Sequence, residues 1–325
     1  MGTAIQSHYL PRGAYLAAFE CEDRPGFVYQ YVRGKEPFQI STQGAAKERN
    51  LYALTGKGGE IKQYIEEMFT MVENGAQPVL EKTLSSVNQT ELTFVERANL
   101  DTFVACQAIR TPAFIEELRQ GAAQLMKAFL QTVAGNEKAF SALVSKFVEP
   151  EKTEDVRKFA LEGEYDVETS GEFYTLQANK LIGPIWNILL RQRLRILVCE
   201  QPVLFTSDHP VSRIPDNAVP SIYRTGFAFS NVMLPIGPRH LLLWENLAPP
   251  LSIPGTTDTF TIPIEHIRPA EARQFSKITM QDAEEYLFGS MRNDKVAQFF
   301  NRTQQKTRVE TFSTPFPGLI MTRHK

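Results

Sequence analysis

Near residue 195 the chain changes its hydrophobic pattern, and this change restricts its fold class. Before it, apolar residues recur at helical spacing; after it come short apolar runs such as FAFSNVMLP and HLLLW, which are typical of buried strands. Helices followed by strands, without regular alternation, indicate an α+β fold. We therefore predict that the N-terminal two-thirds is helical and packs on a mainly antiparallel sheet formed largely by the C-terminal third.

Hydrophobic spacing and turn residues also predict the individual elements. Thr111 and Pro112, for example, offer an N-cap residue followed by a proline suited to the first helical position. The predicted helices comprise residues 45–54, 60–73, 91–109, 112–133, 174–194, 269–275 and 281–300, with a shorter helix after residue 136. The predicted strands comprise residues 27–32, 195–200, 202–208, 227–235, 240–244, 257–264 and 308–313.

The size and composition of the chain favour one large folded unit. Its 325 residues are 42% hydrophobic, which suffices to bury a substantial core. Because the polar motifs described below are spread over most of the chain, we expect residues 1–325 to form a single α+β domain. Residues 149–168 are strongly charged and predict an exposed loop or lid.

The charge balance narrows the classes of partner. Lysine and arginine total 35 against 37 aspartate and glutamate, a formal net charge of -2. Such a balance gives no global attraction to a phosphate backbone, so a nucleic-acid partner is an open alternative that the charge does not favour. Metalloprotease, serine-hydrolase, P-loop and kinase signatures are absent from the sequence.

Cysteine usage and the N-terminal residues indicate the compartment. Cys21, Cys106 and Cys199 lie far apart without CxxC spacing, which is typical of reduced thiols. The first residues lack a basic segment followed by an apolar one, and the most apolar run, residues 181–190, is too short to span a bilayer. We expect a cytoplasmic protein without a membrane partner.

The first polar segment, HYLPR, places His8 and Arg12 close to the beginning of the chain. Leu10, Tyr15 and neighbouring apolar residues predict that this segment docks against the core. His8 is then either a packed histidine that bonds to a backbone carbonyl or part of a site, and Arg12 could bind an anion.

The second segment follows an apolar strand with Thr206, Ser207, Asp208 and His209. Proline at the next position keeps His209 extended, and adjacent residues of an extended chain point to opposite sides. Asp208 is a candidate metal ligand or general base at a strand end, or else a carboxylate that caps backbone amides in a turn. His209 is the weaker candidate of the two.

The third segment is Arg110-Thr111-Pro112, at the junction between two predicted helices. A cation in the last turn of a helix is stabilised by the helix dipole, which explains Arg110 structurally. Alternatively, Arg110 could form a bidentate pair with Asp208 or with a phosphate group.

Taken in order, these segments resemble the microbial domain-of-unknown-function family 4238. The resemblance spans about residues 7–245 and is carried by HYLPR, NLY, RTP, FTSDHPV and LPIGP. The family commonly has Asn where this chain has His209. The resemblance implies a cytoplasmic protein without an assigned reaction, cofactor or substrate. The polar family motifs match His8, Arg12, Arg110, Thr206, Ser207 and Asp208.

Two functions remain open at this stage. The first is a hydrolase acting on phosphoester bonds of a nucleotide or nucleic acid, with His8 as acid/base and Asp208 as base or as ligand of a divalent metal. Its substrate-binding residues would be Arg12, Arg110, Thr206 and Ser207. The second is a non-catalytic sensor or binding module whose polar motifs form a structural network, with a small molecule or nucleotide as ligand. The sequence does not determine the cofactor or the oligomeric state.

Overall fold

A computed structural model of the chain defines the fold over most of its length. It describes residues 6–13, 15–49, 52, 54–55, 61–62, 64–163, 165, 171–215, 226–247, 251–252, 254–303, 312–313 and 320–321. Within these ranges, no helix is long and apolar enough to cross a bilayer. Of the predicted strand 308–313, only the last two residues lie among the described ones, and they form β15 (Phe312–Ser313).

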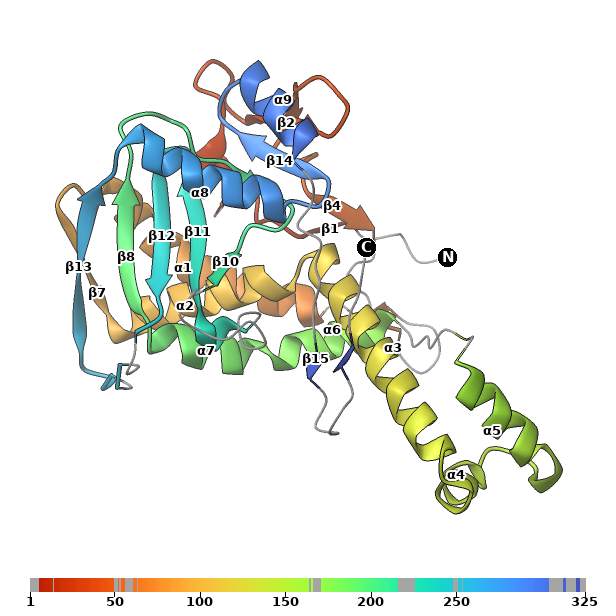
Figure 1. Cartoon of the computed structure of the whole chain (residues 1–325). Coiled ribbons are helices and arrows are strands. Elements are labelled where there is room, and N and C mark those ends of the chain that lie inside the picture. The colour runs from red at the N-terminus through yellow and green to blue at the C-terminus, as the bar shows by residue number, and fades with distance from the viewer. Residues whose placement is uncertain are drawn as a thin grey trace.

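A six-stranded sheet, on the left in Figure 1, is the largest sheet of the described residues. Its pairs are antiparallel except for one parallel pair, β8 with β13. In spatial order the strands are β10 (Ser212–Pro215), β11 (Ser230–Gly237), β12 (His240–Glu245), β8 (Arg193–Val198), β13 (Thr259–His266) and β7 (Gln89–Thr93).

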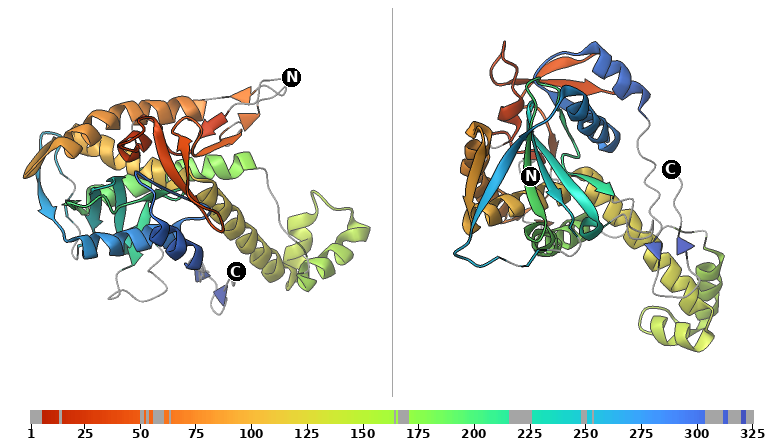
Figure 2. Two further views of the ribbon diagram at one scale, coloured as in Figure 1. Left: turned by 90° about the horizontal axis from the view of Figure 1, so that it is seen from above. Right: turned by 60° about the vertical axis from the view of Figure 1, so that its left-hand side comes forward.

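Both faces of this sheet are buried, which explains the continuous apolar run of β12. Leu242 and Trp244 belong to the largest apolar cluster, which includes residues of α1 and α2, whereas Leu241 and Leu243 cluster with Ala272 of α8. Figures 1 and 2 show α8 on one side of the sheet and α1 and α2 on the other. These helices are α1 (Tyr64–Ser85), α2 (Phe94–Ile109) and α8 (Pro269–Asp282).

A smaller antiparallel sheet lies beside one end of the main sheet (Figure 1). Its central strands β2 and β14 pair over four residues, and β9 adds two more pairs to β14. In spatial order it contains β3 (Phe38–Ser41), β2 (Phe27–Val32), β14 (Tyr286–Gly289) and β9 (Thr206–Ser207). Strand β9 belongs to the second polar segment, so this sheet positions that segment.

Three helices extend away from the sheets and form an arm (Figures 1 and 2). They are α3 (Pro112–Ala134), α4 (Glu137–Val144) and α5 (Thr153–Glu162). A small cluster of Ala134, Phe140 and Ala160 holds them together. The arm includes most of the charged segment 149–168: its described part contains η2 (Pro150–Lys152) and α5.

The remaining elements are short or peripheral. The helices are η1 (Leu16–Phe19), α6 (Gly171–Lys180), α7 (Ile182–Leu190), η4 (Phe227–Phe229) and α9 (Asp294–Arg302). Two-residue and three-residue strands form separate pairs, namely β1 (Gln6–His8) with β4 (Lys47–Arg49), β5 (Leu54–Thr55) with β6 (Ile61–Lys62), and β15 with β16 (Ile320–Met321).

The mixed helix and strand content and the prevalence of antiparallel pairs are confirmed, but the predicted segregation of helices and strands is wrong. Strands occur throughout the chain, and β7, which lies before α2, belongs to the main sheet. The predicted helix 281–300 contains β14, and the helical segment predicted from residue 45 contains β4. The predicted strand 195–200 is confirmed as β8. The strands β14 and β4, which lie in predicted helices, are four and three residues long and depend on distant partners, so local periodicity does not separate them from helical turns.

Candidate functional site

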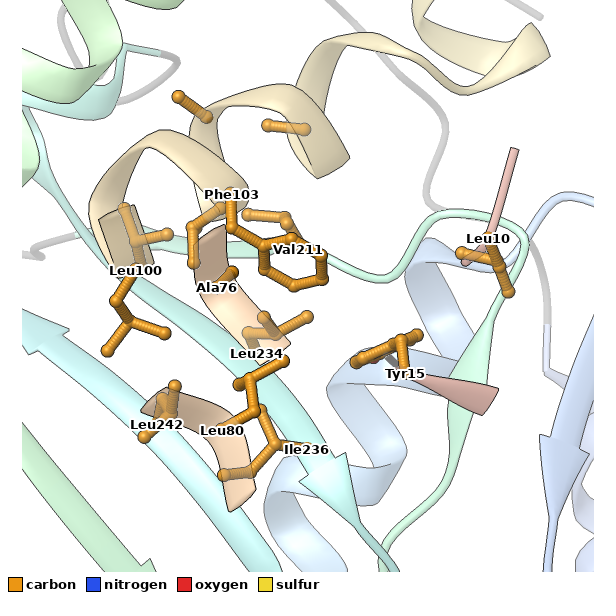
Figure 3. Close-up of a cluster of buried hydrophobic side chains, with 14 of the residues drawn as sticks. Leu10, Tyr15, Ala76, Leu80, Leu100, Phe103, Val211, Leu234, Ile236 and Leu242 are labelled. Atoms are coloured by element: carbon orange, nitrogen blue, oxygen red, sulfur yellow. The ribbon is translucent and has the colours of Figure 1, made fainter. Parts of the chain in front are cut away.

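The first polar segment is fixed between a strand pair and the apolar core. Strand β1 ends at His8, and the amide of Tyr9 donates to the carbonyl of Ala46 at 3.0 Å. Tyr9 and Leu10 are buried, and Figure 3 shows Leu10 beside the apolar cluster. Arg12 is exposed. The core therefore positions His8 and Tyr9, while Arg12 lies at the surface.

The imidazole of His8 lies in a positively charged and partly buried environment. Burial, followed by the positive charge of Lys47, lowers the pKa of His8. A hydrogen bond with the backbone of Ala45 acts in the opposite direction, and Arg12 and Arg110 add smaller lowering effects. Its Nδ1 atom is buried and forms no hydrogen bond with the described residues. The ring is therefore neutral at neutral pH, as a general base or a ligand must be.

Arg110 joins the helix junction to this first segment. It is the C-cap of α2, as the sequence indicated, and its side chain is buried. Its Nη1 donates to Glu73 Oε1 at 2.6 Å, and its Nη2 donates to the backbone carbonyl of His8. The guanidinium also lies over the ring of Phe69, 4.6 Å from its centroid. Its carboxylate partner is thus Glu73 on α1 and not Asp208, the partner considered from the sequence.

The helix junction also contacts the second polar segment. Thr111 caps α3 by accepting a hydrogen bond from the amide of Phe114, and its Oγ1 lies 3.3 Å from Nδ1 of His209. Ser207 Oγ in turn donates to the carbonyl of His209 and accepts from its amide, at 2.9 and 3.1 Å. Ser207 therefore shapes the turn that presents His209 to α3.

Thr206 is joined to the N-terminal segment through Tyr15. The hydroxyl of Tyr15 donates to the carbonyl of Pro235 at 2.6 Å, so it accepts from Thr206 Oγ1, at 2.7 Å. All three residues lie in the interior, and Figure 3 shows Tyr15 beside the same cluster as Leu234. This hydroxyl pair links the strand β9 to the main sheet.

Asp208 binds three consecutive backbone amides. Its Oδ1 accepts from Glu284 at 2.9 Å, and its Oδ2 accepts from Glu285 at 2.7 Å and from Tyr286 at 2.9 Å. Burial raises the pKa of Asp208 to about 6, while the three amides act in the opposite direction. The residue caps backbone amides, but of a segment 76 to 78 positions away rather than of its own turn.

The three polar segments therefore meet in the fold. Arg110 donates a hydrogen bond to the backbone carbonyl of His8, and Thr111 contacts His209. Tyr9 and Asp208 both line a cavity of about 500 Å³, together with Pro112. Each of the three segments thus contributes one residue to the wall of one cleft. Thr206, Ser207 and Arg110 are buried and do not line the cleft, and neither His8 nor Arg12 is among the lining residues.

The cleft is strongly acidic. Its lining includes one lysine, Lys47, and two tyrosines, Tyr9 and Tyr286. Five acidic residues also line it, namely Glu48, Glu116, Asp208, Glu284 and Glu285. Glu116 accepts a hydrogen bond from Arg119, which neutralises part of this charge. The arrangement can attract a cation, and the tyrosine rings offer it apolar and aromatic contact.

The described residues contain no group of three or more His, Cys, Asp and Glu side chains that could hold a metal ion. Asp208, the metal candidate from the sequence, directs both carboxylate oxygens at backbone amides.

Several cleft residues were not recognised in the sequence. Tyr9 lies in the first polar segment, of which the sequence predicts only His8 and Arg12 as site residues. Glu284 and Glu285 directly precede the short apolar run that begins at Tyr286 and ends at Gly289. This run is the local signal for β14. Glu116 is the fifth residue of the correctly predicted helix α3. Nothing in the local sequence of Glu48 distinguishes it.

Comparison with known proteins gives one match. Residues 6–293 match a family described as a protein of unknown function, DUF4238. No curated protein and no solved structure matches the chain.

Proposed function

We propose a function from the site itself, because the chain belongs to the DUF4238 family, whose description assigns no activity. We infer that the protein is a non-catalytic binding module and that its acidic cleft takes an organic cation, such as an amine. The observation that carries this proposal is that Tyr9, Pro112 and Asp208, one residue from each polar segment, line the same cleft. In this proposal, the polar segments form a structural network that keeps the cleft wall rigid.

The charge of the cleft supports a cationic ligand. Five acidic residues and one lysine line the cleft. Asp208 already accepts from backbone amides, and Glu116 is paired with Arg119. Glu48, Glu284 and Glu285 are therefore the carboxylates that favour an ammonium group over a phosphate group. Arg110, which a phosphoester substrate would need, is buried and engaged with Glu73 and the carbonyl of His8. A nucleotide or nucleic acid is accordingly the less favoured partner.

A hydrolase acting on phosphoester bonds is a second candidate, with His8 and Asp208 as its acid/base groups. Its supporting observation is that Asp208 lines the cleft and has a raised pKa, a property that clusters at functional sites. The three backbone amides bound by this carboxylate give the same residue a sufficient structural role, so we rank the binding module first.

The cytoplasm is the proposed location of the protein. Cys21, Cys106 and Cys199 are free and buried, which supports a reducing compartment. We propose no membrane association.

The cleft can be tested by calorimetric titration with spermidine, a linear polyamine, and with adenosine monophosphate. We expect spermidine to bind, and Glu285→Gln to weaken it about tenfold, as the loss of one charge-assisted hydrogen bond implies. Glu91→Gln, an exposed change on β7, is the matched control and should leave the affinity unchanged. Binding of adenosine monophosphate instead, or equal effects of the two variants, would contradict the proposal.

The hydrolase is tested with bis(4-nitrophenyl) phosphate as substrate, with and without added divalent metal. Turnover that His8→Gln abolishes while the melting temperature stays constant would favour it over the binding module. Absence of turnover under both conditions counts against it.

A further inference from the structure

A second cavity, separate from the acidic cleft, lies between α8 and α9. Its volume is about 670 Å³, within the range of roughly 300–1,000 Å³ that is typical of small-molecule sites. Residues 201–203 and Phe205, which precede the second polar segment, form part of its wall. None of the residues that line this cavity lines the acidic cleft.

The interior of this cavity is apolar. Phe205 and Met280 are buried in its wall, and Val296 is partly buried. Met291 and Phe299 also line it, yet they expose 39% and 38% of their surface. Large apolar side chains that gather around a hollow and remain exposed indicate a binding surface. The two methionines add flexibility, because thioether side chains adapt to irregular apolar shapes.

Three cations surround these apolar residues. Arg273 and Lys277 lie one turn apart on α8, and Lys295 lies in the first turn of α9. No carboxylate lines the cavity, and none of the three cations forms an ion pair with a described carboxylate. Arg273 donates to the amide oxygen of Gln201 at 3.2 Å, and Lys277 Nζ lies 5.8 Å from the centroid of the Phe299 ring. Like charges at this helical spacing repel each other, so an anion placed between them would be stabilised.

We propose that this cavity binds an organic anion with an apolar body, such as the carboxylate of a medium-chain fatty acid. The apolar wall would bury the chain, and Arg273, Lys277 and Lys295 would hold the charged end at the rim. An inorganic anion would leave the apolar wall exposed, and a neutral apolar molecule would leave the three cations unpaired. This cavity and the acidic cleft then differ in the charge of the ligand they select, because five acidic residues line the cleft.

The inference can be tested by titrating the full chain with dodecanoate below its micelle concentration. Dodecyl phosphate, dodecyltrimethylammonium and dodecyl maltoside vary the head group at constant chain length. We expect dodecanoate to bind, with an affinity that falls as salt rises from 50 to 300 mM. The cationic and neutral amphiphiles should displace bound dodecanoate only at concentrations at least tenfold higher than dodecyl phosphate requires. Tighter binding of dodecyl phosphate would identify a phosphate rather than a carboxylate as the preferred head group, and would retain the anionic class.

Two variants and one control separate the site from general adsorption. Lys277→Gln combined with Lys295→Gln should weaken dodecanoate at least tenfold, and Val296→Trp should fill the cavity and abolish binding. Lys138→Gln combined with Lys158→Gln removes two exposed charges from the arm and should change nothing. The inference is overturned if the control variant loses as much affinity, or if the chain binds only to vesicles of anionic lipid and not to free dodecanoate. Neither result bears on the acidic cleft, whose test uses a cation.

Discussion

Asp208 and Tyr286 form two hydrogen bonds, and each residue donates one of them. The amide of Asp208 donates to the carbonyl of Tyr286 at 3.1 Å, and the amide of Tyr286 donates to Oδ2 of Asp208 at 2.9 Å. These bonds continue the pairing of β9 with β14, in which Ser207 is opposite Leu287. The carboxylate thus extends a two-residue strand into the turn that forms part of the cleft wall.

Asp208→Asn should lower the free energy of unfolding by about 3 kcal/mol, because one amide oxygen cannot accept three buried N–H groups and the new NH₂ would face donors. Urea denaturation measures the loss. Glu285→Gln keeps its backbone amide and should change stability by less than about 0.5 kcal/mol. An Asp208→Asn protein as stable as the wild type would contradict the capping role.

Tyr15→Phe should cost about 2 kcal/mol, since it leaves the carbonyl of Pro235 and the hydroxyl of Thr206 without their partner in the interior. Thr206→Val removes the other hydroxyl with little change in shape. Because both changes act on one hydrogen-bonded pair, the double variant should lose less than the sum of the two single losses. Strictly additive losses in chemical denaturation would show that the hydroxyls do not interact.

Gly289→Ala should destabilise the smaller sheet, because a Cβ atom at this position would lie 2.6 Å from two ring carbons of Phe205. The Phe205 ring also packs edge-on against Tyr31, with centroids 5.7 Å apart, so it cannot move away freely. We expect a loss of about 2 kcal/mol by overpacking. Gly13→Ala, where a Cβ would meet no atom within 4 Å, is the control and should be nearly neutral. Equal melting temperatures for the two variants would contradict this account.

Signals confined to neighbouring residues could be interpreted from the sequence. Thr111 and Pro112 predicted the start of α3, and the apolar run of residues 240–244 predicted a buried strand. The start of α2 was also encoded locally: Thr93 and Glu96 form a capping box, a spacing that would have moved the predicted start from residue 91 to residue 94.

Signals that depend on distant partners could not be interpreted in this way. Strand β14 pairs with β2 and β9 on either side, and both partners lie far away in the sequence. The short apolar run before Gly289 is a local signal for a strand, but it does not identify these partners. The ion pair of Arg110 with Glu73 joins two residues 37 positions apart, so no local pattern predicts it. The segments of the candidate site were found as motifs, but their division into buried network residues and cleft residues required the fold.

His8 gives the chain a specific pH dependence. An unperturbed histidine titrates near pH 6.5, and burial beside Lys47 lowers the pKa of His8 in the folded protein. Between the lowered pKa and about 6.5 the unfolded chain binds more protons than the folded one, so stability falls as the pH drops through this window. The stabilisation is fully present above pH 6.5 and is lost as the pH approaches the folded-state pKa.

His8→Gln should therefore remove part of the loss of stability between pH 7.5 and 5.5, measured as free energies of unfolding in urea at several pH values. His240→Gln is the matched control, because burial also lowers the pKa of His240. This variant keeps His8 and should therefore keep the pH dependence of stability that His8 contributes. The expected signature is a difference between wild type and His8→Gln that declines on acidification. A difference that stays constant, or that grows in favour of the wild type at low pH, would show that the imidazole of His8 is not held neutral by the fold.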